Sequence, residues 1–285
     1  MTRKSSLTAL RADNNTTLLS FLSGKLGISR SKAKKLLDNK TVFVNRRRTW
    51  MAQHRLQAGD TVEFQADGRG ERFSGTKKAK ILYEDADCLV INKPPGRLST
   101  GRNSIEAVSG AGPGNKDIQA VHRLDRDTSG CLLLAKHSRA ARFLTGLFRK
   151  QRVRKEYRAI ARGRLTARNR PITAPVRGKP ALSRVTTVSA AGGATLVMVT
   201  AVTGRTHQVR KHLASIGHPV IGDKYYGARL PQSEKTLRVT RQMLDACLLE
   251  FVPPGKGKPV TVKAPMPDDF RQCLKKYGLR EQVRG

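Results

Sequence analysis

The chain has 285 residues, of which 38% are hydrophobic, and this length suits one domain of ordinary size together with a smaller one. Lys and Arg number 56 against 21 Asp and Glu, which gives a net charge of +35. An excess of this size opposes a compact state unless a polyanion neutralises it, and this points to nucleic acid as the partner. An anionic membrane surface would require a basic amphipathic helix or a lipidation signal, and the sequence shows neither.

The residue spacing predicts neither a structural metal site nor a membrane span. The four cysteines form no C-x-x-C pair, and the six histidines lack zinc-ligand spacing, so we expect no structural metal. The basic N-terminus is not followed by an uninterrupted apolar segment, which predicts neither a signal peptide nor a membrane span. We therefore expect a cytoplasmic protein.

The first part of the chain predicts a short tail, residues 1–15, and a compact unit over 16–64. An apolar stripe from Leu18 to Leu26 predicts one helix, Arg30–Leu37 predicts a second, and 41–44 and 61–64 read as strands. Basic side chains on the second helix and the following turn are candidate RNA contacts, although they can equally form a solvated face. The shortage of acids favours RNA binding by Arg30, Lys32, Lys34, Lys35, Arg46, Arg47 and Arg48.

The Gly-rich, charged residues 65–78 predict a linker, and the residues after it have a pattern typical of strands. Residues 97–117 read as loop, and 278–285 as a C-terminal tail. Strands and helices are expected in a second domain, 79–277, with strands at 81–83, 88–91, 131–135, 155–161, 185–189, 195–202 and 246–251, and helices from 138 and over 206–216. This order predicts an α+β fold with a largely antiparallel, mixed sheet flanked by helices.

The run Val121–Gly130 contains the chief candidate for catalysis. It sets Asp125 between Arg123 and Arg126, before a tight turn and a buried strand. A single carboxylate, with no Ser–His pair or metal-ligand cluster near it in sequence, suggests nucleophilic or acid/base chemistry without a cofactor. The alternative is an aspartate that pairs with its neighbours and caps a loop, and these ten residues alone favour that alternative.

Further motifs resemble known families. The segments 27–37, 42–45 and 56–62 resemble the S4 RNA-binding domain over about fifty residues. Over residues 79–270 the chain resembles the RluA-type family of pseudouridine synthases. That resemblance is carried by the segments Asn92–Gly96, His122–Gly130, Arg154–Tyr157, Thr203–Arg210 and Gly217–Gly227.

The resemblance implies isomerisation of uridine to pseudouridine in RNA, without cofactor or metal. It makes Asp125 the catalytic carboxylate, which either attacks C1′ or removes the 2′ proton. It makes Arg205 the cation that pairs with Asp125, and such a pair lowers a carboxylate pKa by about 1–3 units. Phosphate binding is the alternative role for Arg205. It also makes Tyr157 the ring that stacks on the uracil and accepts the C5 proton, although without this motif a half-buried strand tyrosine would be the default.

Two more residues take roles from the same resemblance. Arg123 would help to displace the target nucleotide, because a base must leave its stack before it can react. Leu244 would form an apolar wall under the base, whereas Asp245 stands where the family commonly has histidine. We expect a monomer that acts on large-subunit ribosomal RNA, with transfer RNA second. The alternatives are a non-catalytic RNA-binding or ribosome-assembly protein, and a nucleosidase-like hydrolase.

Overall fold

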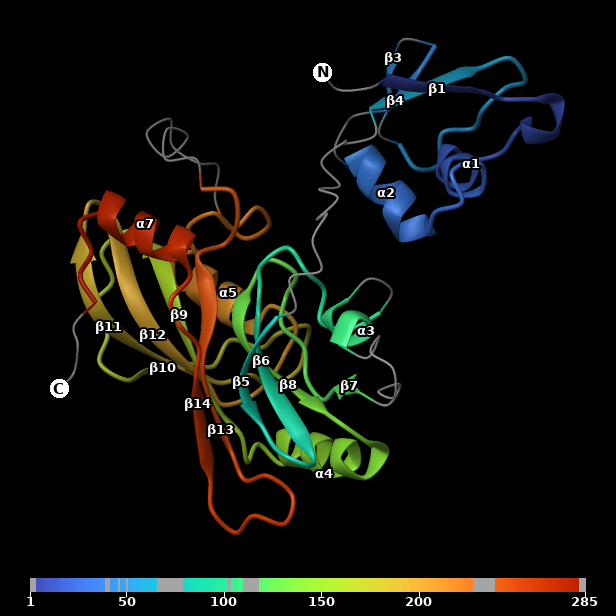
Figure 1. Ribbon diagram of the computed structural model, residues 1–285. Helices are drawn as coiled ribbons and strands as arrows, with labels where there is room; N and C mark the ends of the chain where they lie inside the picture. Colours follow the sequence, from blue (N-terminus) through green and yellow to red (C-terminus); the bar gives the residue numbers. More distant parts are fainter. Residues whose placement is uncertain are drawn as a thin grey trace. The chain divides into compact units, whose positions relative to one another are not determined.

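The computed structural model describes residues 4–38, 42–45, 47–49, 51–65, 79–101, 104–109, 118–227 and 239–281. The chain forms two compact units, Met1–Thr76 and Lys77–Gly285 (Figure 1). Their boundary falls inside the linker expected at 65–78, of which residues 66–78 lie outside the described part.

The first unit packs two helices on a four-stranded sheet with the order β1-β4-β2-β3. Its elements are β1 (Lys4–Thr8), the 3-10 turn η1 (Arg11–Asp13), α1 (Leu18–Lys25), α2 (Arg30–Asp38), β2 (Val42–Val44), β3 (Arg47–Arg48) and β4 (Thr61–Gln65). The Thr17 hydroxyl caps α1 by accepting a hydrogen bond from the Ser20 amide. The expected tail 1–15 is wrong in part, because β1 pairs with β4 and adds a strand to the sheet.

The second unit is built on a ten-stranded sheet. Eight of its strands follow the order β10-β11-β12-β9-β13-β8-β6-β5, and β14 and β7 complete it beside β13 and β8. The pairing is antiparallel throughout except between β13 and β8, which confirms the expected α+β fold with a mixed sheet. The strands are β5 (Lys80–Glu84), β6 (Cys88–Lys93), β7 (Gln119–Ala120), β8 (Ser129–Ala135), β9 (Arg154–Arg162), β10 (Arg170–Ile172), β11 (Ser183–Ala191), β12 (Ala194–Ala201), β13 (Leu244–Phe251) and β14 (Val260–Lys263).

Helices bury both faces of this sheet, which is why its central strands read as continuous apolar runs. On β6 and β8, one face packs on α4 (Ser138–Arg149) through Leu144, and the other faces Ile105 of α3 (Ile105–Ser109). On β9 and β12, one face packs on α5 (Gln208–Ser215) through Leu213, and the other packs on α7 (Asp268–Lys276) through Phe270 (Figure 1). The sheet is therefore a rigid platform for the loops at its strand ends.

Two expectations about irregular segments need correction. The expected loop 97–117 contains the helix α3, although residues 102, 103 and 110–117 lie outside the described part. The expected C-terminal tail is also too long. Leu279 is buried against α7, and its amide donates to the Leu274 carbonyl, so residues 278–281 belong to the domain.

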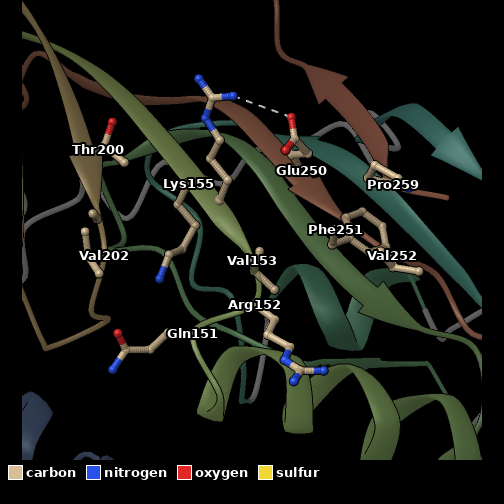
Figure 2. A pocket seen from close by; sticks show the side chains of 12 residues that line it. Gln151, Arg152, Val153, Lys155, Thr200, Val202, Glu250, Phe251, Val252 and Pro259 are labelled. Atoms are coloured by element: carbon tan, nitrogen blue, oxygen red, sulfur yellow. Dashed lines mark ion pairs between the residues drawn. The ribbon is translucent and has the colours of Figure 1, made fainter. Parts of the chain in front are cut away.

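Beside the sheet lies a hollow of about 330 Å³, formed where β9 begins and β12 ends (Figure 2). One side comes from Gln151–Val153, the turn that leads from α4 into β9, and another from Thr200–Val202 at the end of β12. The start of β9, at Arg154 and Lys155, completes it, together with Glu250, Phe251, Val252 and Pro259. Within the described part of the chain, no helix has the length and apolar character needed to cross a membrane.

Candidate active site

Asp125 lies on the loop that enters β8. The loop is fixed at Leu124, whose amide donates to the Ser99 hydroxyl at 2.9 Å and whose carbonyl accepts from it at 3.0 Å. A turn follows, in which the Thr128 amide donates to the Asp125 carbonyl at 3.1 Å. At Gly130 the φ angle is +107°, and an added Cβ would lie 2.2 Å from the Ala246 carbonyl oxygen. Only glycine therefore allows β8 to approach β13 closely at the base of this loop.

A buried lysine ties the loop to its neighbour. The Lys93 ammonium donates to the carbonyls of Pro94, Arg97 and Arg126, at 3.0, 2.8 and 3.0 Å. Three acceptors satisfy all three donors of an ammonium group. Burial lowers the pKa of Lys93 to about 7, against the opposing attraction of the Asp127 charge. Lys93 thus acts as a structural bridge that holds the Pro94–Arg97 loop against the loop of Asp125.

Side chains before β13 brace the same loop from another direction. Arg241 donates from Nη1 to the Asp127 carbonyl at 3.1 Å, and the Gln242 amide group donates to the Thr128 hydroxyl at 2.8 Å. Arg241 is itself held in a fork by Asp269 of α7. The position of Asp125 is therefore set by contacts from three separate segments of the chain.

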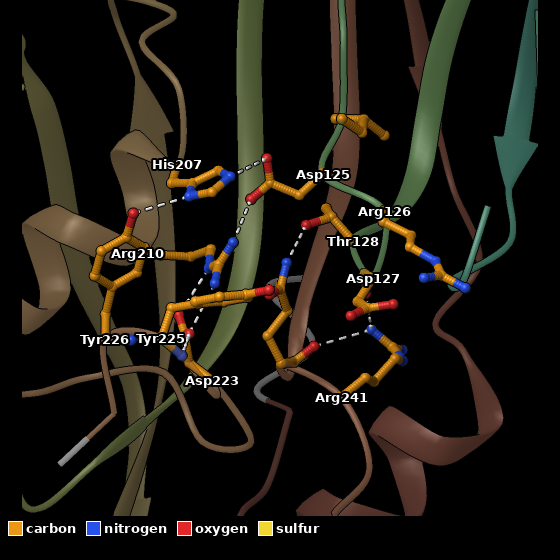
Figure 3. Close-up of polar contacts among 12 residues, drawn as sticks. Asp125, Arg126, Asp127, Thr128, His207, Arg210, Asp223, Tyr225, Tyr226 and Arg241 are labelled. Atoms are coloured by element: carbon orange, nitrogen blue, oxygen red, sulfur yellow. Dashed lines mark hydrogen bonds and ion pairs between the residues drawn. The ribbon is translucent and has the colours of Figure 1, made fainter. Parts of the chain in front are cut away.

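Arg210 of α5 is the cation that faces Asp125. Its Nη1 donates to Asp125 Oδ2 at 2.9 Å, while its Nε and Nη2 form a fork with the two oxygens of Asp223, at 2.7 and 2.8 Å (Figure 3). The Arg210 side chain is 3% exposed, and that of Asp125 is 23% exposed. The guanidinium is thus locked by one buried carboxylate and presented to a second that a substrate can reach.

The electrostatics of the three groups follow from this arrangement. Burial alone would lower the pKa of Arg210, but its hydrogen bonds to Asp223 and Asp125 raise the pKa above its usual value. Burial alone would raise the pKa of Asp223, but hydrogen bonds from Arg210 and from the Tyr225 amide lower it. Arg210 is consequently a permanent positive charge beside Asp125.

The expectation that Arg205 pairs with Asp125 is wrong. The Arg205 Nε donates to the Pro180 carbonyl at 3.1 Å, and the side chain is exposed. The segment turns sharply at His207, which has a φ angle of +57° immediately before α5. This turn separates the two arginines, so that Arg210 projects toward Asp125 and Arg205 lies outside the pair.

His207 and Tyr226 close the remaining side of the carboxylate. The His207 Nε2 lies 3.7 Å from Asp125 Oδ1, and its Nδ1 lies 2.9 Å from the Tyr226 hydroxyl. Burial lowers the pKa of His207, although the Asp125 charge opposes that shift. The Tyr226 ring also lies against the Arg210 guanidinium, at 5.0 Å from the ring centre (Figure 3).

Tyr157 lies on β9, packed against the apolar residues around Leu124 and Leu244. Burial raises the pKa of its phenol, and the negative charge of Asp125 raises it further, so the ring is neutral at physiological pH. Leu244 is buried beneath this cluster at the start of β13. The structure therefore brings Asp125, Arg210, Tyr157 and Leu244 to one place.

Comparison with known proteins matches this arrangement to one family. A family model described as RNA pseudouridylate synthase matches residues 87–215. The ribosomal large subunit pseudouridine synthase C of Escherichia coli K12 is 33% identical in an alignment of 284 positions. The aligned region covers 88% of this chain and 89% of that protein. This chain belongs to the RNA pseudouridylate synthase family. It is therefore an isomerase, as the RluA-type motifs imply.

Other members of the RNA pseudouridylate synthase family agree in sequence and fold. The ribosomal large subunit pseudouridine synthase C of Vibrio cholerae is 33% identical in an alignment of 288 positions. The aligned region covers 90% of this chain and 91% of that protein. The structure of human RNA pseudouridylate synthase domain containing 1 is 25% identical, with a TM-score of 0.56, over 73% of this chain and 97% of that one. Human RNA pseudouridylate synthase domain containing 4 shares the fold, with a TM-score of 0.59 at 24% identity over 70% and 93%.

In this synthase, sequence reasoning assigned no role to Arg210, Asp223, His207 or Lys93. All four stand in segments that carry the family resemblance, so the residues were in view but their partners were not. The strongest available sign of a partner for Arg210 was a second acid, Asp223, which follows a glycine in the segment Gly217–Gly227. One guanidinium can serve two carboxylates, and that pattern favours a buried arginine between them.

The remaining candidate RNA contacts are Arg123 and the basic residues of the first unit. Arg123 is exposed on the loop two residues before Asp125. In the first unit, Arg30 and Lys34 are exposed on α2, and the Arg30 Nη2 donates to the Ser20 hydroxyl at 3.1 Å. Arg46 and the side chains of Lys32, Lys35, Arg47 and Arg48 lie outside the described part.

Proposed function

We propose that this synthase isomerises uridine in large-subunit ribosomal RNA and that Asp125 is its catalytic carboxylate. The substrate class rests on two relatives named for the large ribosomal subunit, each aligned over about nine-tenths of this chain. The assignment of Asp125 rests on one observation. Its carboxylate is reachable by substrate, and it is hydrogen-bonded to an arginine that a second, buried carboxylate holds in place.

The reaction breaks the N1–C1′ bond, turns the uracil and joins it again through C5. Asp125 either attacks C1′ or removes the 2′ proton, and each route requires the ionised carboxylate. Arg210 donates to Oδ2, whereas among the described residues Oδ1 has no recorded hydrogen bond and lies 3.7 Å from the His207 Nε2. We therefore assign Oδ1 as the reacting oxygen.

Tyr157 supplies an aromatic surface within electrostatic range of the Asp125 carboxylate. Stacking of a base on an aromatic side chain contributes roughly 1–3 kcal/mol. Burial and the charge of Asp125 raise the pKa of the phenol, which favours stacking over acceptance of the C5 proton. Leu244 packs below the ring, and we assign it as the apolar support of the uracil.

Arg123 and the first unit provide the proposed contacts to the rest of the RNA. Arg123 is exposed two residues from Asp125, where its side chain can replace an extruded nucleotide in the RNA stack. The first unit would bind RNA in the manner of an S4 domain through Arg30, Lys32, Lys34, Lys35, Arg46, Arg47 and Arg48. Since one chain carries Asp125, Arg210 and Tyr157 together, we propose a cytoplasmic enzyme that is complete as a monomer.

The test is pseudouridine formation in unmodified transcripts of large-subunit ribosomal RNA and of transfer RNA. The product is mapped by carbodiimide labelling, and free uracil is assayed in parallel. Asp125→Asn should lower the rate by at least about 10²–10⁴-fold, the scale of a lost acid/base group, while RNA binding persists. The matched control is Asp268→Asn, an aspartate on α7 that is 91% exposed.

Each other result has a separate meaning. Activity on transfer RNA alone would move the substrate class, and release of free uracil would indicate hydrolysis instead of isomerisation. Pseudouridine formation by Asp125→Asn at the rate of the unmodified enzyme would overturn the catalytic assignment. Binding of RNA by the unmodified enzyme without any conversion would support a non-catalytic protein.

A further inference from the structure

A second buried lysine differs from Lys93 in one respect. Lys155 near the start of β9 is 7% exposed, yet among the described residues its ammonium has no hydrogen-bond or ion-pair partner. The centre of the Phe148 ring lies 5.9 Å from Nζ. Burial lowers the pKa of Lys155 to about 8. The stem of Lys155 is buried, but its Nζ is not among the fully buried side-chain atoms that lack a partner, so the ammonium can be reached by a ligand. Lysine is seldom this buried without a paired ammonium, and in a protein that binds a polyanion this indicates a ligand contact.

Lys155 lines the hollow between β9 and β12, and the other charges there are mainly positive. Arg152 and Arg154 line it as well, and the one carboxylate, Glu250, lies 3.6 Å from Arg154 (Figure 2). Val153, Val202 and Phe251 give the rest of the lining an apolar character. A cationic hollow with apolar walls suits a phosphate with its attached ribose.

The position of Lys155 connects this hollow to the active site. Lys155 and Tyr157 are two residues apart on β9, so their side chains point to the same face of the sheet. Two residues of strand span about 7 Å. On the opposite side, a Cβ placed on Gly204 would lie 3.8 Å from the Lys155 Nζ, and Gly204 precedes the segment that carries His207 and Arg210. A group bound to the ammonium would therefore belong to the target nucleotide or to its neighbour.

We propose that the hollow is a second RNA subsite, in which the Lys155 ammonium binds a backbone phosphate next to the target uridine. The proposal rests on the RNA substrate and the Asp125 site assigned above. It gives the Lys155 ammonium, which has no hydrogen-bond acceptor among the described residues, an acceptor in a phosphate oxygen of the substrate. Arg152, which is exposed, supplies a second positive charge for the same strand.

The experiment measures RNA binding in the inactive Asp125→Asn background, with a fragment of large-subunit ribosomal RNA that surrounds the mapped uridine. Lys155→Met keeps the apolar stem and removes the charge. Affinity should fall about 5–30-fold, and the slope of log K against log salt should fall by about 0.7, the value for one phosphate contact on a single strand. Lys275→Met is the matched control, because it removes one charge from an exposed position on α7.

A second arm locates the phosphate. Each phosphate near the target uridine is replaced in turn by an uncharged methylphosphonate. In the parent protein, which keeps Lys155, one methylphosphonate should weaken RNA binding. In Lys155→Met the same methylphosphonate should have no further effect, as expected for two directly interacting groups. The half of the scan made on the parent protein needs no variant, and it identifies the phosphate whose charge matters even if Lys155→Met is unstable.

Two outcomes would overturn the subsite. One is a salt slope and affinity for Lys155→Met equal to those of Lys275→Met. The other is a negative scan. Either no single methylphosphonate weakens binding to the parent protein, or each one that does so weakens binding to Lys155→Met equally. Both readouts are binding measurements, so failure of the subsite is distinguishable from failure of the proposed reaction, which appears as absent pseudouridine.

Discussion

Arg210 shows how one side chain can organise the carboxylate that we propose as catalytic. Its fork is occupied by Asp223, and only the remaining Nη1 is directed at Asp125. A planar guanidinium with five donors can make both contacts at once, whereas a lysine ammonium is a point charge without a fixed fork. The geometry therefore depends on arginine at this position and not merely on a positive charge.

Arg210→Lys should lower kcat/KM by about 10²–10³-fold, the scale of losing a preorganised donor at a reacting group. Lysine cannot hold Asp223 in a fork and reach Asp125 in the same geometry. Arg205→Lys is the comparison within the same segment, and it should stay within about threefold because Arg205 contacts a backbone carbonyl at the surface. Rates are measured on the mapped RNA, with thermal denaturation as the check on folding.

The opposite ranking would be decisive. If Arg205→Lys abolished turnover and Arg210→Lys did not, the pair seen here between Arg210 and Asp125 would not be the functional one. Equal and small effects of both variants would show that Asp125 needs no fixed cation.

At the scale of single residues, the sequence predicts chemistry better than partnership. Asp125 and Tyr157 stand in motifs whose order and residue types specify a role. The partner of Asp125 depends instead on the left-handed turn at His207, which a sequence of two nearby arginines does not specify. Likewise, the three carbonyls around Lys93 come from residues 94, 97 and 126, and no periodic pattern links them.

At the scale of elements, the central strands were predictable and their order was not. The run Cys131–Ala135 is apolar because both faces of β8 are buried, which is a local signal. The parallel pairing of β8 with β13 joins Ser129 to Asp245, far apart in sequence, and rests on the close approach at Gly130. Pairings of this kind have no signal within either strand.

Asp245 of β13 stabilises this junction. Its carboxylate is fully buried and accepts hydrogen bonds from Arg158 Nε of β9 at 2.8 Å and from the Ser129 hydroxyl at 2.5 Å. The departure from the common family histidine is thus matched by a buried arginine. Asp245→Asn leaves the Arg158 charge with only the more exposed Glu281, whose Oε1 lies 3.5 Å from Nη1, as a recorded counterion among the described residues. Removal of one partner of a buried pair costs about 3–5 kcal/mol. Urea denaturation should show this loss in the free energy of unfolding.

The control for Asp245→Asn is the same chemical change on the same strand. Glu250 also faces an arginine, but its pair with Arg154 is partly exposed and has a separation of 3.6 Å. Glu250→Gln should change the free energy of unfolding by less than about 1 kcal/mol, as for other surface pairs. Equal effects of the two substitutions would show that the buried pair adds no stability at the junction.

At the scale of the whole molecule, the dominant property is the charge of +35. Both units share in it, so each is expected to contact RNA phosphates. In the second unit the cations near the active site include Arg123, Lys155 and Arg152. In the first unit they gather on α2. Contacts from two units would make binding steeply dependent on salt, because each phosphate contact releases condensed counterions.

Neutralising the basic residues of α2 tests this division. The full-length variant with Arg30→Gln, Lys32→Gln, Lys34→Gln and Lys35→Gln should bind RNA more weakly, and its log–log salt slope should fall by up to about 3, at roughly 0.7 for each lost contact with a single strand. A variant with four neutralised cations, three on α7 at Arg271, Lys275 and Lys276 and a fourth at nearby Arg280, serves as the control for net charge. Equal slopes for the two variants would mean that the basic residues of α2 form a solvated surface and make no phosphate contact.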